Sequence, residues 1–166
     1  MLVYLVRHAI AIERNGVPGF DDASRPLTDK GIDRMRRIVR GLDHLGVTVD
    51  EIWTSPLVRA RQTADILAKS RHFQGGVRVV PALAPGGDAT QVLRELHSGG
   101  PRTAVALVGH EPDMGELAGL LLTGRSAALF DFKKGGVACI EIEKSGMPLH
   151  GKLCWLMTPK QLRNIG

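Results

Sequence analysis

Residues 1–8 read Met-Leu-Val-Tyr-Leu-Val-Arg-His, and the interpretation of the whole chain begins from this stretch. Its first six residues are apolar and rich in β-branched and aromatic types, which predicts a strand buried on both faces of a sheet. Arg7 and His8 follow directly. Ligands of open α/β sheets bind beyond the carboxyl ends of the strands. A guanidinium group there suits phosphate, and an imidazole suits a nucleophile, a base or a metal ligand.

The rest of the chain alternates between strand-like and helix-like segments. Strands are predicted at residues 2–6, 51–54, 77–80 and 103–108, and helices at 28–46, 57–70, 88–96 and 112–122. This alternation predicts an α/β fold with three layers, α/β/α, around a mostly parallel sheet. Two further strands, 136–142 and 152–157, predict an antiparallel hairpin at the sheet edge, and a short helix follows from Pro159. We expect a single domain over residues 1–166.

Composition argues against several functional classes. The net charge of +5 favours anionic partners. However, the sequence has no aromatic residues interleaved with basic ones and no zinc-finger spacing, so we predict no nucleic-acid partner. No apolar stretch approaches the roughly 20 residues that span a bilayer, so we also predict no membrane partner. Arg7 interrupts the one N-terminal apolar run, and we expect a cytoplasmic protein.

The two cysteines, Cys139 and Cys154, are too few for a disulfide framework and too far apart for a metal cluster. We expect both to be reduced, buried thiols on neighbouring strands. A metal or redox role for them is therefore not predicted.

Chemically active side chains recur at the ends of three predicted strands. Arg7 and His8 follow the first strand, residues 55–63 with Arg59 follow the second, and Gly109-His110 follows the fourth. If these strands are parallel, two histidines and at least two arginines meet at one edge of the sheet. The helix that begins after Ser55 would also direct backbone N–H groups toward an anion at that edge.

This combination resembles the histidine phosphatase superfamily, the phosphoglycerate-mutase-like group. The matching pieces follow the family's order over residues 3 to about 122 and are Arg7-His8, Leu27-Thr28 with Gly31, Ser55-Pro56 with Arg59, Ala60, Gln62 and Thr63, and Gly109-His110. The short chain and the block Arg25-Pro26-Leu27-Thr28 are most similar to the SixA-type phosphohistidine phosphatases of this family.

The resemblance implies a mechanism. His8 would attack phosphorus and form a covalent phosphohistidine. Arg7, Arg59 and His110 would bind the equatorial oxygens of the phosphate anion, and water would then release it. The resemblance implies no metal and no other cofactor, because these side chains supply the positive charge. The attacking nitrogen of His8 must be unprotonated, so we expect a backbone carbonyl to hold its other nitrogen.

Three residues are further candidates for substrate binding: Arg25, Ser55 and Glu13. Arg25 either reaches the phosphate or lies on the surface, and the resemblance favours the first. The connection at 9–26 is long and rich in turn formers, which predicts a lid or a substrate-binding wall over 13–25. Glu111 either orients His110 or begins a helix, and we expect Arg61 to face solvent.

The chain departs from the family pattern at two places. Ala9 stands where the family usually has glycine and adds a methyl group near the nucleophile. Larger members carry a glutamate in the segment after the third strand, whereas residues 81–88 contain none. Asp88 is available as a general acid, but we expect it to cap a helix. The alternatives, each expected to be a solvated loop charge, are Glu13, Asp21 and Asp22.

The missing acid favours one class of substrate. An alkoxide leaving group is strongly basic and needs protonation, which a general acid supplies with an effect of about 10²–10⁴-fold. An imidazole leaving group is far less basic, and its phosphoryl transfer to His8 exchanges one P–N bond for another. We therefore predict a phosphatase for a phosphohistidine-bearing protein. The alternatives are a phosphatase for a small phosphomonoester and a non-catalytic phosphate-binding module, against which the presence of a nucleophile argues. The oligomeric state is not predicted.

Overall fold

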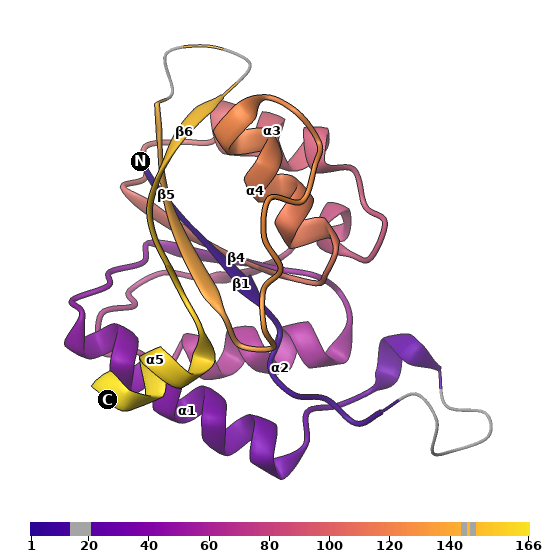
Figure 1. Cartoon of the computed structure of the whole chain (residues 1–166), viewed down its shortest axis with the longest axis vertical. Helices are drawn as coiled ribbons and strands as arrows, with labels where there is room; N and C mark the ends of the chain where they lie inside the picture. The colour runs from indigo at the N-terminus through magenta and orange to yellow at the C-terminus, as the bar shows by residue number, and fades with distance from the viewer. Residues whose placement is uncertain (14–20, 144–145, 147–148) are drawn as a thin grey trace.

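The computed structural model describes residues 1–13, 21–143, 146 and 149–166. Their strands form one six-stranded sheet in the order β3-β2-β4-β1-β5-β6 (Figure 1). The strands are β1 (Leu2–Arg7), β2 (Glu51–Thr54), β3 (Val77–Val79), β4 (Ala104–Gly109), β5 (Val137–Glu143) and β6 (His150–Met157). The first four are parallel, whereas β5 runs antiparallel to β1 and β6 antiparallel to β5. The predicted parallel sheet with a C-terminal hairpin at its edge is confirmed.

Helices cover both faces of this sheet (Figure 1). One face carries α1 (Asp29–His44), α2 (Val58–Leu67) and α5 (Pro159–Ile165), and the other carries α3 (Ala89–Ser98) and α4 (Asp113–Thr123). Two short 3₁₀ helices, η1 (Asp22–Ser24) and η2 (Pro81–Leu83), lie in the connections. The predicted three layers are therefore confirmed. Within the described part of the chain, none of the helices combines the length and apolarity needed to cross a bilayer.

Strand β1 lies inside the sheet and contributes to both cores. Tyr4 and Val6 pack toward α1 and α2, whereas Val3 and Leu5 pack toward α3 and α4. A fully buried side chain of this size contributes about 1.5–3 kcal/mol relative to an exposed one. The strand that precedes His8 is thus held firmly on both faces, as its continuous apolar run predicted.

Local signals set most of the helix boundaries. The Thr28 side chain caps α1 by accepting a hydrogen bond from the Gly31 N–H at 3.0 Å, as the sequence predicted. Gly46 follows α1 with φ 68°, a left-handed conformation that favours glycine. Helix α2 ends at Leu67 rather than at the predicted Ser70, because the Ser70 N–H bonds to the Leu67 carbonyl three residues back.

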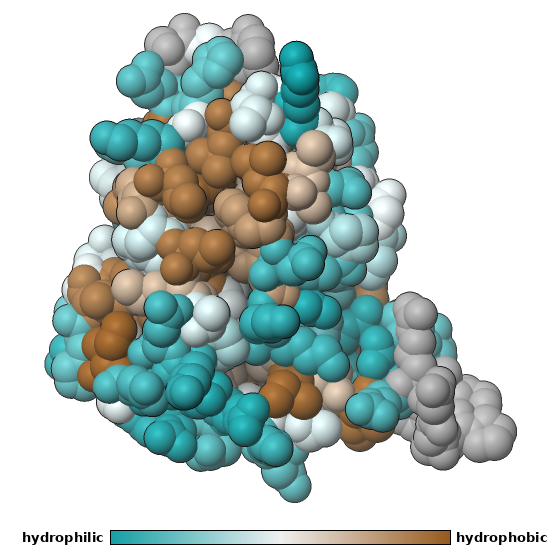
Figure 2. All heavy atoms as spheres, viewed as in Figure 1, coloured by the Kyte–Doolittle hydropathy of each residue, from teal (hydrophilic) through white to brown (hydrophobic). Residues whose placement is uncertain are grey.

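The prediction for the cysteines is correct for the strands and wrong for the burial of one thiol. Cys139 on β5 is buried, whereas Cys154 on β6 is exposed, and both are free. The register shifts beside Cys139, which pairs with Trp155, so that Cys154 has no direct partner across the pair. Within the described residues, no further strand pairs with the outer side of β6. Figure 2 shows apolar side chains gathered over β6 and the adjoining α4.

Gly31 allows the first turn of α1 to approach the segment that follows His8. A Cβ atom at Gly31 would lie 2.1 Å from the carbonyl oxygen of Ile10. The same carbonyl accepts hydrogen bonds from the Thr28 N–H at 3.0 Å and from the Thr28 hydroxyl at 3.3 Å. A side chain at position 31 would therefore push apart α1 and the chain beside the candidate nucleophile.

We expect Gly31→Ala to lower the free energy of unfolding by about 1–3 kcal/mol, because the backbone must shift to admit the methyl group. In an open helix the same change would raise stability by about 1 kcal/mol. Urea titration measures the difference. The control is Gly100→Ala, where the added Cβ meets nothing within 4 Å and the change should stay within about 0.5 kcal/mol. Equal losses of stability in the two variants would contradict the close approach of Gly31 to the Ile10 carbonyl.

Candidate functional site

The parallel pairing of β1 with β4 brings two of the predicted strand ends together. Arg7 lies opposite Gly109 in this pair, and the His8 N–H donates to the Gly109 carbonyl at 3.0 Å. His8 directly follows Arg7, and His110 directly follows Gly109. The ring centroids of the two histidines are 5.1 Å apart. Strand β2 adds the third end, because its pairing with β4 places Ser55 at the same edge.

Two contacts fix the tautomer of the buried His8 ring. Its Nδ1 lies 2.7 Å from the Ala9 carbonyl oxygen, and the Arg59 Nε donates to its Nε2 at 3.3 Å. A carbonyl only accepts and a guanidinium only donates, so Nδ1 carries the proton and Nε2 the lone pair. Burial lowers the pKa of His8 to about 4, and the charges of Arg59 and Arg7 act in the same direction. His8 is therefore neutral at pH 7.

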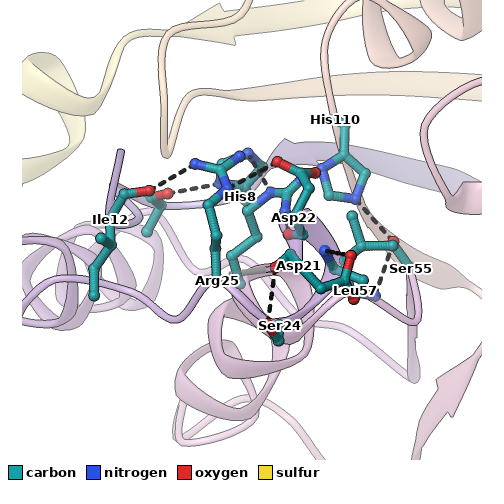
Figure 3. Close-up of polar contacts among 12 residues, drawn as sticks. His8, Ile12, Asp21, Asp22, Ser24, Arg25, Ser55, Leu57 and His110 are labelled. Atoms are coloured by element: carbon teal, nitrogen blue, oxygen red, sulfur yellow. Dashed lines mark hydrogen bonds and ion pairs between the residues drawn. The ribbon is translucent and has the colours of Figure 1, made fainter. Parts of the chain in front are cut away.

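His110 lies beside it with a different set of contacts. Its Nε2 is 2.8 Å from the Ser55 hydroxyl, which also accepts a hydrogen bond from the Leu57 N–H at 3.3 Å (Figure 3). Burial lowers the pKa of His110 to about 3, with smaller contributions from His8 and Arg59. Its Nδ1 is buried without a partner among the described residues. Ser55 thus orients the ring, and Nδ1 remains available to a bound oxygen.

Helix α2 holds the site together through three residues of its first two turns, Arg59, Gln62 and Thr63. Arg59 contacts His8 as described, and one turn later the Thr63 hydroxyl donates to the Arg59 carbonyl at 2.7 Å. The Thr63 hydroxyl also accepts from the Ala9 N–H at 3.0 Å. The Gln62 side chain accepts from the Leu27 N–H at 2.7 Å. The sequence identified Gln62 and Thr63 by resemblance but did not predict that they anchor the backbone around the connection.

Ala9 itself packs in the core on the side of α1 and α2. Its methyl group, the first departure from the family pattern, is therefore part of that core.

The described part of the 9–26 connection forms one wall of the site. Arg25 Nε donates to Asp22 Oδ1 at 2.8 Å, and its Nη1 donates to the Ile12 carbonyl at 2.6 Å (Figure 3). The other carboxylate oxygen of Asp22 lies 3.1 Å from Arg59 Nη2. The structure thus places Arg25 beside Asp22, which also pairs with Arg59, while a contact between Arg25 and phosphate stays a prediction. Of the predicted lid at 13–25, residues 14–20 lie outside the described part, and Glu13 is exposed beside it.

Arg7 is held from the opposite side. Its Nη1 donates to the Phe132 carbonyl at 2.5 Å, and the Phe132 N–H donates to Glu111 Oε1 at 3.0 Å. Burial raises the pKa of Glu111. Glu111 does not begin a helix, because α4 begins at Asp113, and its carboxylate holds Phe132. A role of Glu111 in orienting His110 stays a prediction. No local pattern shows this, because Glu111 and Phe132 are far apart in the chain.

The remaining candidate acids have structural partners. Asp88 caps α3 by accepting from the Thr90 N–H at 2.8 Å, as predicted. Asp21 caps η1 through the Ala23 N–H at 3.3 Å. Asp22, expected to be a solvated loop charge, instead bridges two arginines of the site. Within residues 1–13, 21–143 and 149–166, acidic, histidine and cysteine side chains form no group of three that could hold a metal ion.

The two buried histidines link the stability of the protein to pH. Their pKa values of about 4 and 3 lie below the 6.5 of a free histidine, so the unfolded chain binds more protons in this window. The free energy of unfolding should fall as the pH falls from 7 toward 4, by at most about 1.4 kcal/mol per pH unit for each histidine. Urea titrations between pH 7 and 5 measure the slope. The dependence of unfolding free energy on pH should be shallower in His110→Gln. An unchanged dependence would contradict the lowering of the His110 pKa by burial.

Comparison with known proteins places this site in a family. The sequence model of the Histidine phosphatase superfamily (branch 1) matches residues 3–84. Phosphohistidine phosphatase SixA of Escherichia coli (strain K12) is 28% identical over 98% of this chain and 97% of its own length. An uncharacterised protein of Picosynechococcus sp. is 36% identical over 98% of this chain and 99% of its own.

The solved structures agree with the sequence comparison. The structure of the protein histidine phosphatase SixA complexed with tungstate superimposes with a TM-score of 0.85 at 27% identity, over 98% of this chain and 99% of that one. The family match includes Arg7, His8 and Arg59, and the full-length similarity extends beyond His110. The chain therefore belongs to the histidine phosphatase superfamily, as a SixA-like phosphatase.

Proposed function

We propose that this phosphatase hydrolyses phosphohistidine on a protein, through a covalent phosphoryl group on His8 and without a metal ion or other cofactor. The observation that carries the proposal is the state of the His8 ring. It is neutral at pH 7, and its partners leave the lone pair on Nε2, beside the guanidinium of Arg59. A neutral, oriented imidazole is a competent nucleophile toward phosphorus.

The surrounding charges suit a phosphoryl group in the transition state. Arg7, Arg25 and Arg59 supply fixed guanidinium forks, and the Nδ1 of His110 is buried without a partner among the described residues. Negative charge develops on the equatorial oxygens during transfer, and preorganised donors stabilise it. These cationic side chains fill the electrostatic role that metal ions have in other phosphoryl-transfer enzymes.

The reaction then has two balanced steps. The Nε2 lone pair of His8 forms a bond to phosphorus while the substrate P–N bond breaks. The departing imidazole takes up a proton from water, and the hydroxide left behind accepts a proton that is released when phosphate forms in the second step. A second water molecule next attacks the phosphorus on His8. The bond between His8 and phosphorus breaks, and inorganic phosphate leaves with its protons supplied by that water.

The acidic residues near the site favour an imidazole leaving group over an alkoxide. Asp88 caps α3, and Glu13 is exposed. Asp22 pairs with two arginines, which stabilise its ionised form and leave it an acceptor rather than a proton donor. Among the described residues, the candidate acids Glu13, Asp22 and Asp88 thus include no ready proton donor, which suits phosphohistidine, and the name of the SixA relative supports the same substrate class.

A rate comparison tests the proposal. We would measure turnover of a phosphohistidine-bearing protein and of a simple alkyl phosphomonoester, with wild type and His8→Ala. We expect fast P–N cleavage, slow ester cleavage and the loss of both in the variant, whose melting temperature would report that it is folded. Comparable ester cleavage would favour the small-phosphomonoester alternative. No turnover of either substrate would favour a phosphate-binding module.

Two arginines of α2 allow the effect of a positive charge inside the site to be compared with that of a positive charge on the surface. Arg59 is buried and contacts His8, whereas Arg61, two residues on, is exposed as predicted. We expect Arg59→Ala to lower kcat/KM by about 10²–10³-fold, the effect of losing one preorganised donor. Arg61→Ala removes the same charge and should change kcat/KM by less than about twofold. A loss below tenfold for Arg59→Ala would place Arg59 outside the site.

A further inference from the structure

We propose that Asp22 competes with the phosphoryl group for Arg25 and Arg59, and that its return to these arginines promotes release of the product phosphate. The inference rests on the proposed function, because it takes both arginines to be ligands of the phosphoryl group. It assigns Asp22 the role of an internal oxyanion that determines how tightly the site holds phosphate.

The contacts of Asp22 place its carboxylate among the cationic groups of the site. One oxygen accepts from Arg25 Nε at 2.8 Å, and the other lies 3.1 Å from Arg59 Nη2. The backbone carbonyl of Asp22 accepts from Arg59 Nη1 at 2.7 Å. In Figure 3 the carboxylate lies between the Arg25 side chain and the His110 ring. Burial lowers the pKa of His110, and the negative charge of Asp22 partly opposes this effect.

A carboxylate and a phosphoryl group present similar pairs of oxygens to a guanidinium fork. The N–H groups of Arg25 and Arg59 that contact Asp22 are donors that the oxygens of a phosphoryl group would need. One donor cannot make a full hydrogen bond to both acceptors. Binding of a phosphoryl group through these same N–H groups therefore requires the Asp22 carboxylate to withdraw.

The burial of the three side chains indicates which of them moves. The side chain of Arg59 is 4% exposed and that of Arg25 14%, whereas that of Asp22 is 32% exposed. Asp22 also belongs to η1, a single turn of three residues in the connection. The arginines are thus the fixed part of the arrangement, and the carboxylate is the part with access to solvent.

The exchange has a consequence for turnover. A phosphate dianion held by several arginines would dissociate slowly, because each charge-assisted hydrogen bond must be broken. When the Asp22 carboxylate recaptures both arginines, these bonds are replaced as the phosphate leaves. Asp22 thereby weakens product binding and keeps the guanidinium groups paired between turnovers.

Titration calorimetry with inorganic phosphate and with tungstate tests this competition. We expect Asp22→Asn to bind both oxyanions about tenfold more tightly than wild type, because the competing charge-assisted hydrogen bonds are weakened. The matched control is Asp21→Asn. It removes the same charge at the neighbouring residue, whose side chain caps η1. Its affinities should stay within about twofold of wild type.

Two outcomes would overturn the inference. Unchanged or weaker binding by Asp22→Asn would mean that Asp22 only positions the arginines. Equal tightening in the two variants would mean that general electrostatics accounts for the effect. Asp22→Ala, which removes both acceptor oxygens, serves as a second variant, and thermal melting reports the folding of each. In turnover, the inhibition constant of phosphate should fall about tenfold in Asp22→Asn.

Failure of the inference and failure of the proposed function give different results. If His8→Ala is inactive while Asp22→Asn fails to bind phosphate more tightly, the phosphatase proposal stands and the competition does not. If His8→Ala retains activity while Asp22→Asn binds phosphate more tightly, the competition stands and His8 is not the nucleophile.

Discussion

The parallel register between β1 and β4 is the constraint on which the site depends. With Arg7 opposite Gly109, the next residue of each strand is a histidine, and the two rings come within 5.1 Å. Side chains alternate between the faces of a sheet, so a slip of one residue would turn every side chain of β1 to the other face. The apolar packing of β1 on both faces prevents this slip and so fixes the position of His8.

Burial and charge together determine what the histidines can do. Removal from water lowers the pKa values of His8 and His110, and the arginines nearby add to the effect. Both rings are therefore neutral at a pH where an exposed histidine would be partly charged. Guanidinium groups also attract oxyanions, so one arrangement of charge both keeps His8 unprotonated and suits the proposed phosphoryl site. Asp22 balances part of this positive charge.

Residues behind the site hold the backbone rather than a ligand. Thr63 joins Arg59 to the segment after His8, and Gln62 holds the backbone N–H of Leu27. On the other side, Glu111 holds Phe132, whose carbonyl orients Arg7. These contacts explain why residues such as Gln62 and Thr63 stand at fixed spacings from Arg59, although their side chains hold backbone groups. They keep the donors oriented without reorganisation during transfer.

The sequence by itself determined the layers of the fold. It also brought Arg7, His8, Arg59 and His110 together as one candidate site. Continuous apolar runs identified the parallel strands, Thr28 and Asp88 identified helix starts, and polar residues at strand ends identified His8 and His110. These signals are local, since each lies within one element and its cap. The tertiary structure decided what distant segments do to one another: the partners of Asp22, the contact between Glu111 and Phe132, and the exposure of Cys154 beside a shifted register. Such contacts depend on how elements pack across the sheet, and no spacing within one element encodes them.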